Sequence, residues 1–141
     1  MYPKYVLEEN EDMLRFIFFS IFILSYNFVA YTQTIESFIS SLGKADYATI
    51  ESFLSEKLDL YVKDQQRYVP KSEAINTIKY FFADHSPKAI EPVHQGSSRQ
   101  TGGGHYRLAK LDTSNGTFRV FIYYESEGKQ VKVKELRFEK Y

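Results

Sequence analysis

Apolar residues recur at helical spacing in three segments of the chain. The first spans residues 34–42 and ends before Gly43, because glycine commonly follows a helix. The second begins at Asp46, a suitable N-cap, and the third begins at Ser72 and ends at residues 85–87. Their apolar stripes are, in chain order, Ile35, Phe38, Ile39 and Leu42; Tyr47, Ile50, Phe53 and Leu54; and Ile75, Ile78, Phe81 and Phe82. The pattern therefore predicts three helices, of which the first two form a hairpin.

Alternating apolar and polar residues predict strands elsewhere in the chain. Residues 58–62 form the first strand, and residues 67–69 form a short second one that ends at Pro70. From Lys88 onward, alternation predicts four more strands, at residues 89–96, 105–113, 117–126 and 129–140. An antiparallel sheet with helices on one face is a two-layer α+β domain with a single core.

The turns between the last strands predict the register of the sheet. A type I′ turn at Asn115-Gly116, which needs positive φ at both residues, pairs Asp112 with Arg119. A second two-residue turn at Glu127-Gly128 then brings Glu135 onto the apolar face, opposite Val120. One extra residue near Lys134-Glu135 returns the following apolar side chains to the apolar face and brings Leu136 opposite Val120. We therefore expect a β-bulge there. The resulting apolar face is Ala109, Leu111, Phe118, Val120, Ile122, Val131, Val133, Leu136 and Phe138.

The N-terminal segment has the pattern of a signal peptide. Residues 16–24 are apolar except for Ser20 and follow Arg15. This run is too short to favour the alternative, a permanent membrane anchor, because a spanning helix needs roughly 20 apolar residues. Cleavage after Ala30 or after Thr32 fits the small residues there. We therefore expect residues 1–32 to be a signal peptide and residues 33–141 to be a mature domain that is exported, periplasmic or secreted.

The first twelve residues do not fit this signal peptide. They carry Glu8, Glu9, Glu11 and Asp12, whereas the start of a signal peptide is normally basic. This acidic stretch predicts that residues 1–12 are a misassigned start and that translation begins at Met13.

Composition narrows the classes of function. The chain carries 18 basic and 18 acidic residues, so no excess positive charge favours nucleic acid as a partner. The absence of cysteine excludes thiolate metal sites and a cysteine nucleophile. His85, His94 and His105 lack metal-ligand spacing, and residues 102–104, three glycines, lack the lysine of a phosphate-binding loop. The sequence therefore predicts no metal and no cofactor.

The order of elements resembles the cone-shaped nuclear transport factor 2-like superfamily, which also contains ketosteroid isomerases and polyketide cyclases. Residues 94–98, 115–120 and 134–138 are more specifically similar to an exported bacterial family, domain of unknown function 4783. This resemblance covers residues 34–140. It implies an α+β, cone-like fold, with three N-terminal helices packed on a bent, mainly antiparallel sheet, and it implies no particular activity.

Candidate catalytic groups are few. Enzymes of the superfamily place acids and bases inside the cone, but the predicted apolar face is almost entirely aliphatic or aromatic. His94 is the best remaining group for proton transfer because imidazole titrates near neutrality, and Tyr61 and Tyr106 are its candidate assistants. In the simpler interpretation, His94 lies on an edge strand and supports the turn at residues 96–98. His94, Tyr61 and Tyr106 are thus the candidate ligand-binding residues.

The second face of the predicted sheet gathers Tyr106, Leu108, Phe121 and Tyr123 among basic residues. Aromatic residues and arginines are enriched at contact surfaces, and in similar cone folds this face often pairs two subunits. We therefore expect a homodimer or a protein partner there; the alternative is a ladder of stacked side chains on a solvated sheet.

These observations favour an exported, non-catalytic binding or assembly module that holds a small apolar molecule or a protein. The alternative is a small-molecule isomerase, dehydratase or hydrolase of the ketosteroid-isomerase type, with its site in the cone. A cavity of about 300 Å³ or more, lined by convergent ionisable groups, distinguishes the enzyme from the module.

Overall fold

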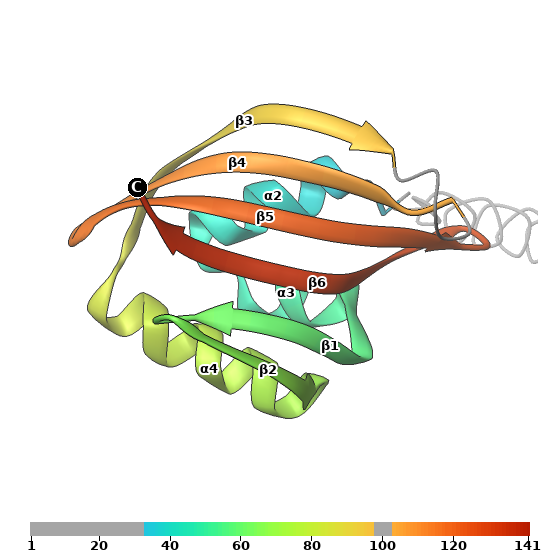
Figure 1. Ribbon diagram of the computed structural model, residues 1–141, viewed down its shortest axis with the longest axis horizontal. Helices are drawn as coiled ribbons and strands as arrows, with labels where there is room; N and C mark the ends of the chain where they lie inside the picture. Colours follow the sequence, from blue (N-terminus) through green and yellow to red (C-terminus); the bar gives the residue numbers. More distant parts are fainter. Residues whose placement is uncertain (1–32, 98–102) are drawn as a thin grey trace, which may run out of the picture. The chain divides into compact units, whose positions relative to one another are not determined.

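In the part of the chain that the structure describes, three helices pack on one face of a six-stranded sheet (Figure 1). The computed structural model describes residues 33–97 and 103–141, so the predicted signal peptide, its cleavage site and the predicted start at Met13 lie outside the described residues. The helices are α2 (Ile35–Lys44), α3 (Tyr47–Phe53) and α4 (Lys71–Asp84). The strands are β1 (Leu54–Val62), β2 (Gln65–Pro70), β3 (Pro87–Ser97), β4 (His105–Thr113), β5 (Gly116–Glu127) and β6 (Gln130–Lys140). None of the helices in the described ranges is long and apolar enough to cross a membrane.

Helix α2 continues through Gly43, so the expected end before this residue is wrong. The helix ends instead at Lys44, and Ala45, its C-cap, has a left-handed φ of 51°. A Cβ added at Gly43 would lie only 2.6 Å from Cγ2 of Ile90 in β3. Gly43 therefore provides a close approach between helix and strand rather than a stop signal.

The starts of the other two helices differ in how well the sequence predicts them. Asp46 caps α3 as expected, because its carboxylate accepts a hydrogen bond from the Thr49 backbone N–H at 3.2 Å. Helix α4 begins at Lys71, so the predicted cap at Ser72 is wrong. Pro70 precedes it with φ −67° and without a side-chain capping bond. The chain thus passes directly from β2 into α4.

The sheet is mainly antiparallel, as predicted, with the strand order β2-β1-β6-β5-β4-β3. The pairing of β1 with β6 is parallel, and the other four pairings are antiparallel. Strand β3 forms one edge, which confirms the expected edge position of His94. Pro87 and Pro92 lie at the two register breaks of this strand. Prolines and bulges at an edge hinder the addition of another strand.

The hairpin between β4 and β5 turns one residue earlier than predicted, which shifts the pairing of the two strands by two residues. Thr113 pairs with Gly116, so the connecting residues are Ser114 and Asn115. Only Gly116 has positive φ there, at 100°, which rules out the predicted type I′ turn at Asn115-Gly116. The Thr113 hydroxyl accepts from the Asn115 N–H at 3.1 Å and donates to the Gly116 carbonyl at 2.7 Å. This side chain therefore stabilises a turn that the Asn-Gly pattern does not reveal.

The predicted β-bulge in β6 is confirmed. Tyr124 pairs with Val133, whereas its neighbour Tyr123 pairs with Glu135, so Lys134 is the extra residue. The predicted turn at Glu127-Gly128 is wrong, however: Glu127 pairs with Gln130, so the turn lies one residue later. The pairing along β6 therefore differs from the prediction by two residues, and Leu136 lies opposite Ile122. A shift of two residues leaves every side chain on its predicted face.

The space between the helices and the sheet is filled by apolar side chains. The ring centroid of Phe81 lies 4.9 Å from that of Phe138 and 5.0 Å from that of Phe118. Of the apolar face predicted from the sequence, all residues are buried except Val131, which is partly buried. Burial of a large apolar side chain contributes about 1.5 to 3 kcal/mol, so this face alone holds the helices firmly.

Candidate functional site

The inner face of the sheet, which packs on the helices, becomes polar at the end where β4 begins. Leu111 and Ala109 of β4 are buried, but the next two positions on the same face are Arg107 and His105. Gln95 and Ser97 of β3 pair with them, and Tyr124 of β5 lies opposite His105. These side chains line a hollow of about 380 Å³. This end pocket is formed by Gln95, Gly96, Ser97, His105, Arg107 and Tyr124.

Arg107 is the most buried charged group of the end pocket. Its side chain is only 19% exposed, and its Nη2 forms an ion pair with a carboxylate oxygen of Glu36 in α2. Its Nε is buried and has no hydrogen-bond acceptor. The rings of His105 and Tyr124 lie nearby, 5.6 Å apart with an interplanar angle of 31°.

The sequence interpretation missed this pocket. It followed the inner face of β4 only through Ala109 and Leu111, which are both apolar. Continuing the same two-residue alternation backward gives Arg107 and His105, so the signal was present. Glu36 had no comparable signal, because it meets Arg107 across 71 positions of sequence.

The opposite face of the sheet, the outer face, carries two rows of side chains that cross five strands. The first row contains, from β1 to β3, Tyr61, Arg137, Phe121, Leu108 and His94. The second contains Asp59, Glu135, Tyr123, Tyr106 and Gly96. All the ligand-binding and partner residues predicted from the sequence therefore lie on this face rather than in the core.

The structure brings together some of these predicted residues and separates others. Tyr106 lies 5.9 Å from His94 between ring centroids, but Tyr61 is at the opposite end of the row. Asp64 accepts a hydrogen bond from the Tyr61 hydroxyl at 3.1 Å, and this bond raises the pKa of Tyr61. The ligand-binding role of His94, Tyr61 and Tyr106 stays a prediction.

Two tyrosine rings of the outer face lie over glycines. A Cβ added at Gly96 would come within 2.5 Å of the Tyr106 ring, and one added at Gly104 would overlap the Tyr123 ring. Tyr106 also stacks on Phe121, with 6.0 Å between centroids and 21° between planes. Because glycine has no side chain, it lets these rings lie close to the backbone.

Charged residues flank the aromatic ones on the outer face. Arg119 donates to Glu139 at 2.7 Å, and Arg137 forms an ion pair with Glu135. The guanidinium carbon of Arg137 also lies 5.8 Å from the centre of the Phe121 ring. Together these residues and Leu108 line a hollow of about 300 Å³. The surface therefore contains an apolar floor and charges of both signs.

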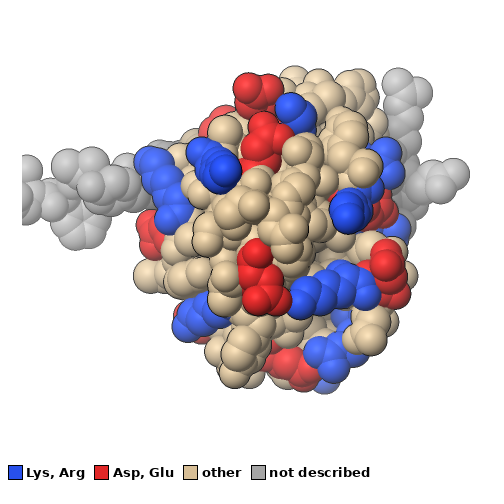
Figure 2. Space-filling view, turned by 90° about the vertical axis from the view of Figure 1, so that its left-hand side faces the viewer, with Lys and Arg blue, Asp and Glu red and all other residues tan. Residues whose placement is uncertain are grey.

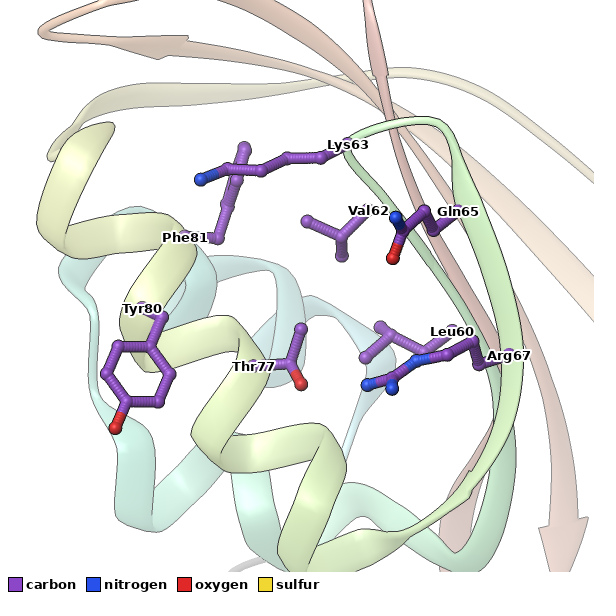
Figure 3. A pocket seen from close by; sticks show the side chains of 8 residues that line it. All are labelled: Leu60, Val62, Lys63, Gln65, Arg67, Thr77, Tyr80 and Phe81. Carbon is purple, nitrogen blue, oxygen red and sulfur yellow. The ribbon is translucent and has the colours of Figure 1, made fainter.

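A third pocket lies between α4 and the β1–β2 hairpin (Figure 3) and has a volume of about 140 Å³. Its two basic residues are already paired: Lys63 with Asp84 at 3.1 Å, and Arg67 with Glu73 at 2.6 Å. Figure 2 likewise shows basic and acidic side chains interspersed on the face it presents. These features form no single-sign patch that would attract a charged polymer.

The histidines are dispersed over the described domain. His85 follows α4 and stacks on Phe81 at 4.5 Å, whereas His94 is on the outer face and His105 is on the inner one. Within residues 33–97 and 103–141, no three histidine, aspartate or glutamate residues are grouped so as to hold a metal ion.

The family model of a domain of unknown function, DUF4783, matches residues 35–139. A DUF4783 family protein from Bacteroides uniformis ATCC 8492 is 22% identical, with a TM-score of 0.69; the match covers 77% of this chain and 98% of that chain. A DUF4783 family protein from Bacteroides fragilis YCH46 is 19% identical, with a TM-score of 0.68; the match covers 74% of this chain and 96% of that chain. These matches confirm the family resemblance predicted from the sequence.

An NTF2-like protein from Cytophaga hutchinsonii ATCC 33406 is similar over 75% of this chain and 91% of its own, at 13% identity and a TM-score of 0.56. At such identities the solved structures show the fold alone, and they confirm the α+β cone-like architecture. No curated protein matches the sequence.

Proposed function

The chain belongs to the DUF4783 family, and from this premise and its own geometry we propose that it is an exported, non-catalytic assembly module that forms a homodimer through the outer face. The observation that carries the proposal is the stacked aromatic surface. Tyr106, Leu108, Phe121 and Tyr123 lie side by side and are half-buried, although no described helix packs on this face. Aromatic residues held in place by their neighbours lose little freedom on binding.

The charges of the outer face suit a second copy of the same chain. In a two-fold dimer a patch meets itself, so a surface of one sign would repel its copy. Here the two arginines Arg119 and Arg137 alternate with the two glutamates Glu135 and Glu139. A two-fold axis near this cluster lets each arginine face a glutamate of the partner.

The core supports a role other than catalysis. Where the superfamily's enzymes hold acids and bases, the described residues present fully buried aromatic and aliphatic side chains, among them Phe38, Phe53, Phe81 and Phe138. The end pocket is the one feature that favours the enzymatic alternative, an isomerase, dehydratase or hydrolase. It exceeds about 300 Å³ and contains His105. It lies beside the filled core rather than within it, however, and its arginine is engaged by Glu36.

Sedimentation velocity of the full chain over a range of concentrations tests the homodimer. We expect a dimer for the wild type and monomers for Phe121→Asp and Tyr123→Asp, because each places a charge in the centre of the interface. Tyr80→Asp is the matched control: Tyr80 is 76% exposed on α4, away from the outer face. Circular dichroism checks that each variant folds. A wild type that stays monomeric at high concentration, or a folded Phe121→Asp that dimerises like Tyr80→Asp, excludes the proposal.

Export rests on the pattern of residues 1–32 and has a separate test. Mass spectrometry of the chain recovered outside the cytoplasm should find Tyr31 or Gln33 at the N-terminus, after cleavage at one of the two expected positions. Recovery of the chain only in the cytoplasm, with its N-terminal segment intact, would contradict export without affecting the dimer.

A further inference from the structure

The lining of the end pocket is polar on every strand that contributes to it. Gln95 and Ser97 of β3 lie opposite Arg107 and His105 of β4, and Tyr124 of β5 completes the wall. An apolar ligand would cover these groups without offering them hydrogen bonds, which is unfavourable. The chemistry of this pocket therefore suits a hydrophilic ligand, in contrast to the small apolar molecule that the sequence favoured.

Arg107 has an unused donor in this pocket. Buried donors almost always have an acceptor, yet the Nε of this largely buried side chain has none. Nε and Nη2 of a guanidinium point in parallel and match the two oxygens of one carboxylate. Glu36 meets only Nη2, through a single oxygen. One edge of the guanidinium is thus only partly satisfied.

The charge of the site selects among anions. Arg107 is neutralised by Glu36, and among the other side chains that line the end pocket only the His105 imidazole can carry a positive charge. A singly charged carboxylate keeps the site close to neutral, whereas a doubly charged phosphate would leave an excess of negative charge.

We propose that the end pocket binds a small hydroxylated or amide-bearing monocarboxylate, with its carboxylate on the guanidinium of Arg107 and its other polar groups on Ser97, His105 and Tyr124. This inference goes beyond the proposed assembly function and does not depend on the outer face. It assigns the missing acceptor of Arg107 to a ligand rather than to Glu36.

The Nε–H resonance of Arg107 in a ¹⁵N–¹H correlation spectrum of the labelled full chain reports on this contact directly. Lactate is the probe, lactamide is its uncharged counterpart, and inorganic phosphate is the competing anion. We expect a saturable shift of the Arg107 Nε–H peak with lactate, none with lactamide, and a weaker effect with phosphate. The backbone peaks of Ser97 and Tyr124 should titrate with the same affinity.

Variants separate binding from a general effect of charge. Arg107→Lys keeps the charge but loses the two-pronged contact, so it should weaken lactate binding about tenfold or more, as followed by the Ser97 and Tyr124 peaks. His105→Ala, at a half-buried position, tests the same site in case Arg107→Lys fails to fold. Arg119→Lys, on the outer face, is the matched control and should bind as the wild type does.

Three results overturn the proposal. The first is an Nε–H peak that does not respond to lactate, which would leave Glu36 or solvent as the partner of Arg107. The second is an equal response to lactamide, and the third is tighter binding of phosphate than of lactate. Loss of dimerisation in sedimentation experiments would leave this inference untouched, so the two proposals fail separately.

Discussion

The close approach between α2 and β3 leads to a quantitative prediction about Gly43. Alanine at a helical position is favoured over glycine by about 1 kcal/mol, so Gly43→Ala should stabilise an exposed helix. Here, however, the new Cβ would lie 2.6 Å from Cγ2 of Ile90, a contact far shorter than van der Waals distance. Ile90 is β-branched and partly buried against the core, so it has little freedom to move away.

The balance of these two effects gives the expected sign. Overpacking of this kind costs about 1 to 3 kcal/mol, which outweighs the gain in helix propensity. We therefore expect Gly43→Ala to lower the free energy of unfolding by up to about 2 kcal/mol, the difference between the two effects. In an Ile90→Ala background the obstructing methyl group is absent, and the same substitution should raise the free energy of unfolding by about 1 kcal/mol.

Urea denaturation of the four proteins of this cycle, followed by circular dichroism, measures the coupling between the two positions. A coupling of about 1 to 3 kcal/mol is expected for residues in direct contact. Glu51→Ala, at an exposed position of α3, serves as control and should have the same small effect in both backgrounds. The reasoning is wrong if Gly43→Ala stabilises the wild type, or if its effect is independent of Ile90.

Three further predictions concern stability. Phe118→Ala removes an edge-on contact with the Phe81 ring, whose centroid is 5.0 Å away, and should lower the free energy of unfolding by about 3 to 5 kcal/mol. A loss below about 1 kcal/mol in urea denaturation would contradict this prediction. Gly116 has φ 100° with open space around its Cα, so Gly116→Ala should cost about 1 to 2 kcal/mol from backbone strain alone, and an unchanged denaturation midpoint would show that the turn relaxes. Hydrogen bonds from the side chain and backbone of Thr49 lower the pKa of Asp46. The stabilising effect of the Asp46 carboxylate is therefore complete above its unfolded-state pKa and is lost as pH falls through its folded-state pKa. The stability difference between wild type and Asp46→Ala should therefore shrink below about pH 4, and a constant difference would refute this assignment.

The sequence predicted which side chains are buried better than it predicted which ones are neighbours. Alternation along β4, β5 and β6 assigns faces without reference to the turns, so the apolar face was predicted correctly despite the register error. The error arose because the Thr113 hydroxyl stabilises a turn one residue before the Asn-Gly pair. Such a local side-chain bond competes with backbone preference and has no periodic signature.

The candidate site was predicted only in part for the same kind of reason. The aromatic cluster of the outer face follows from alternation, and the structure places Tyr106 beside Phe121 as a stacked pair. His105 and Arg107 belong to the same alternation and were overlooked. The contact of Arg107 with Glu36, by contrast, depends on where α2 docks on the sheet, which no local pattern specifies.

The bulge at Lys134 has a consequence for how this strand tolerates changes in length. The step from Val133 to Leu136 spans three positions, so removal of Lys134 alone would restore strict alternation and leave Leu136 and Phe138 facing the helices. Removal of Arg137, in the regular part of the strand, would instead turn Phe138 to water. An insertion in the turn at residues 128–129 would only lengthen a surface loop. Natural variants of this domain should thus vary in length at that turn and at Lys134, and hardly at all at the other positions of β6.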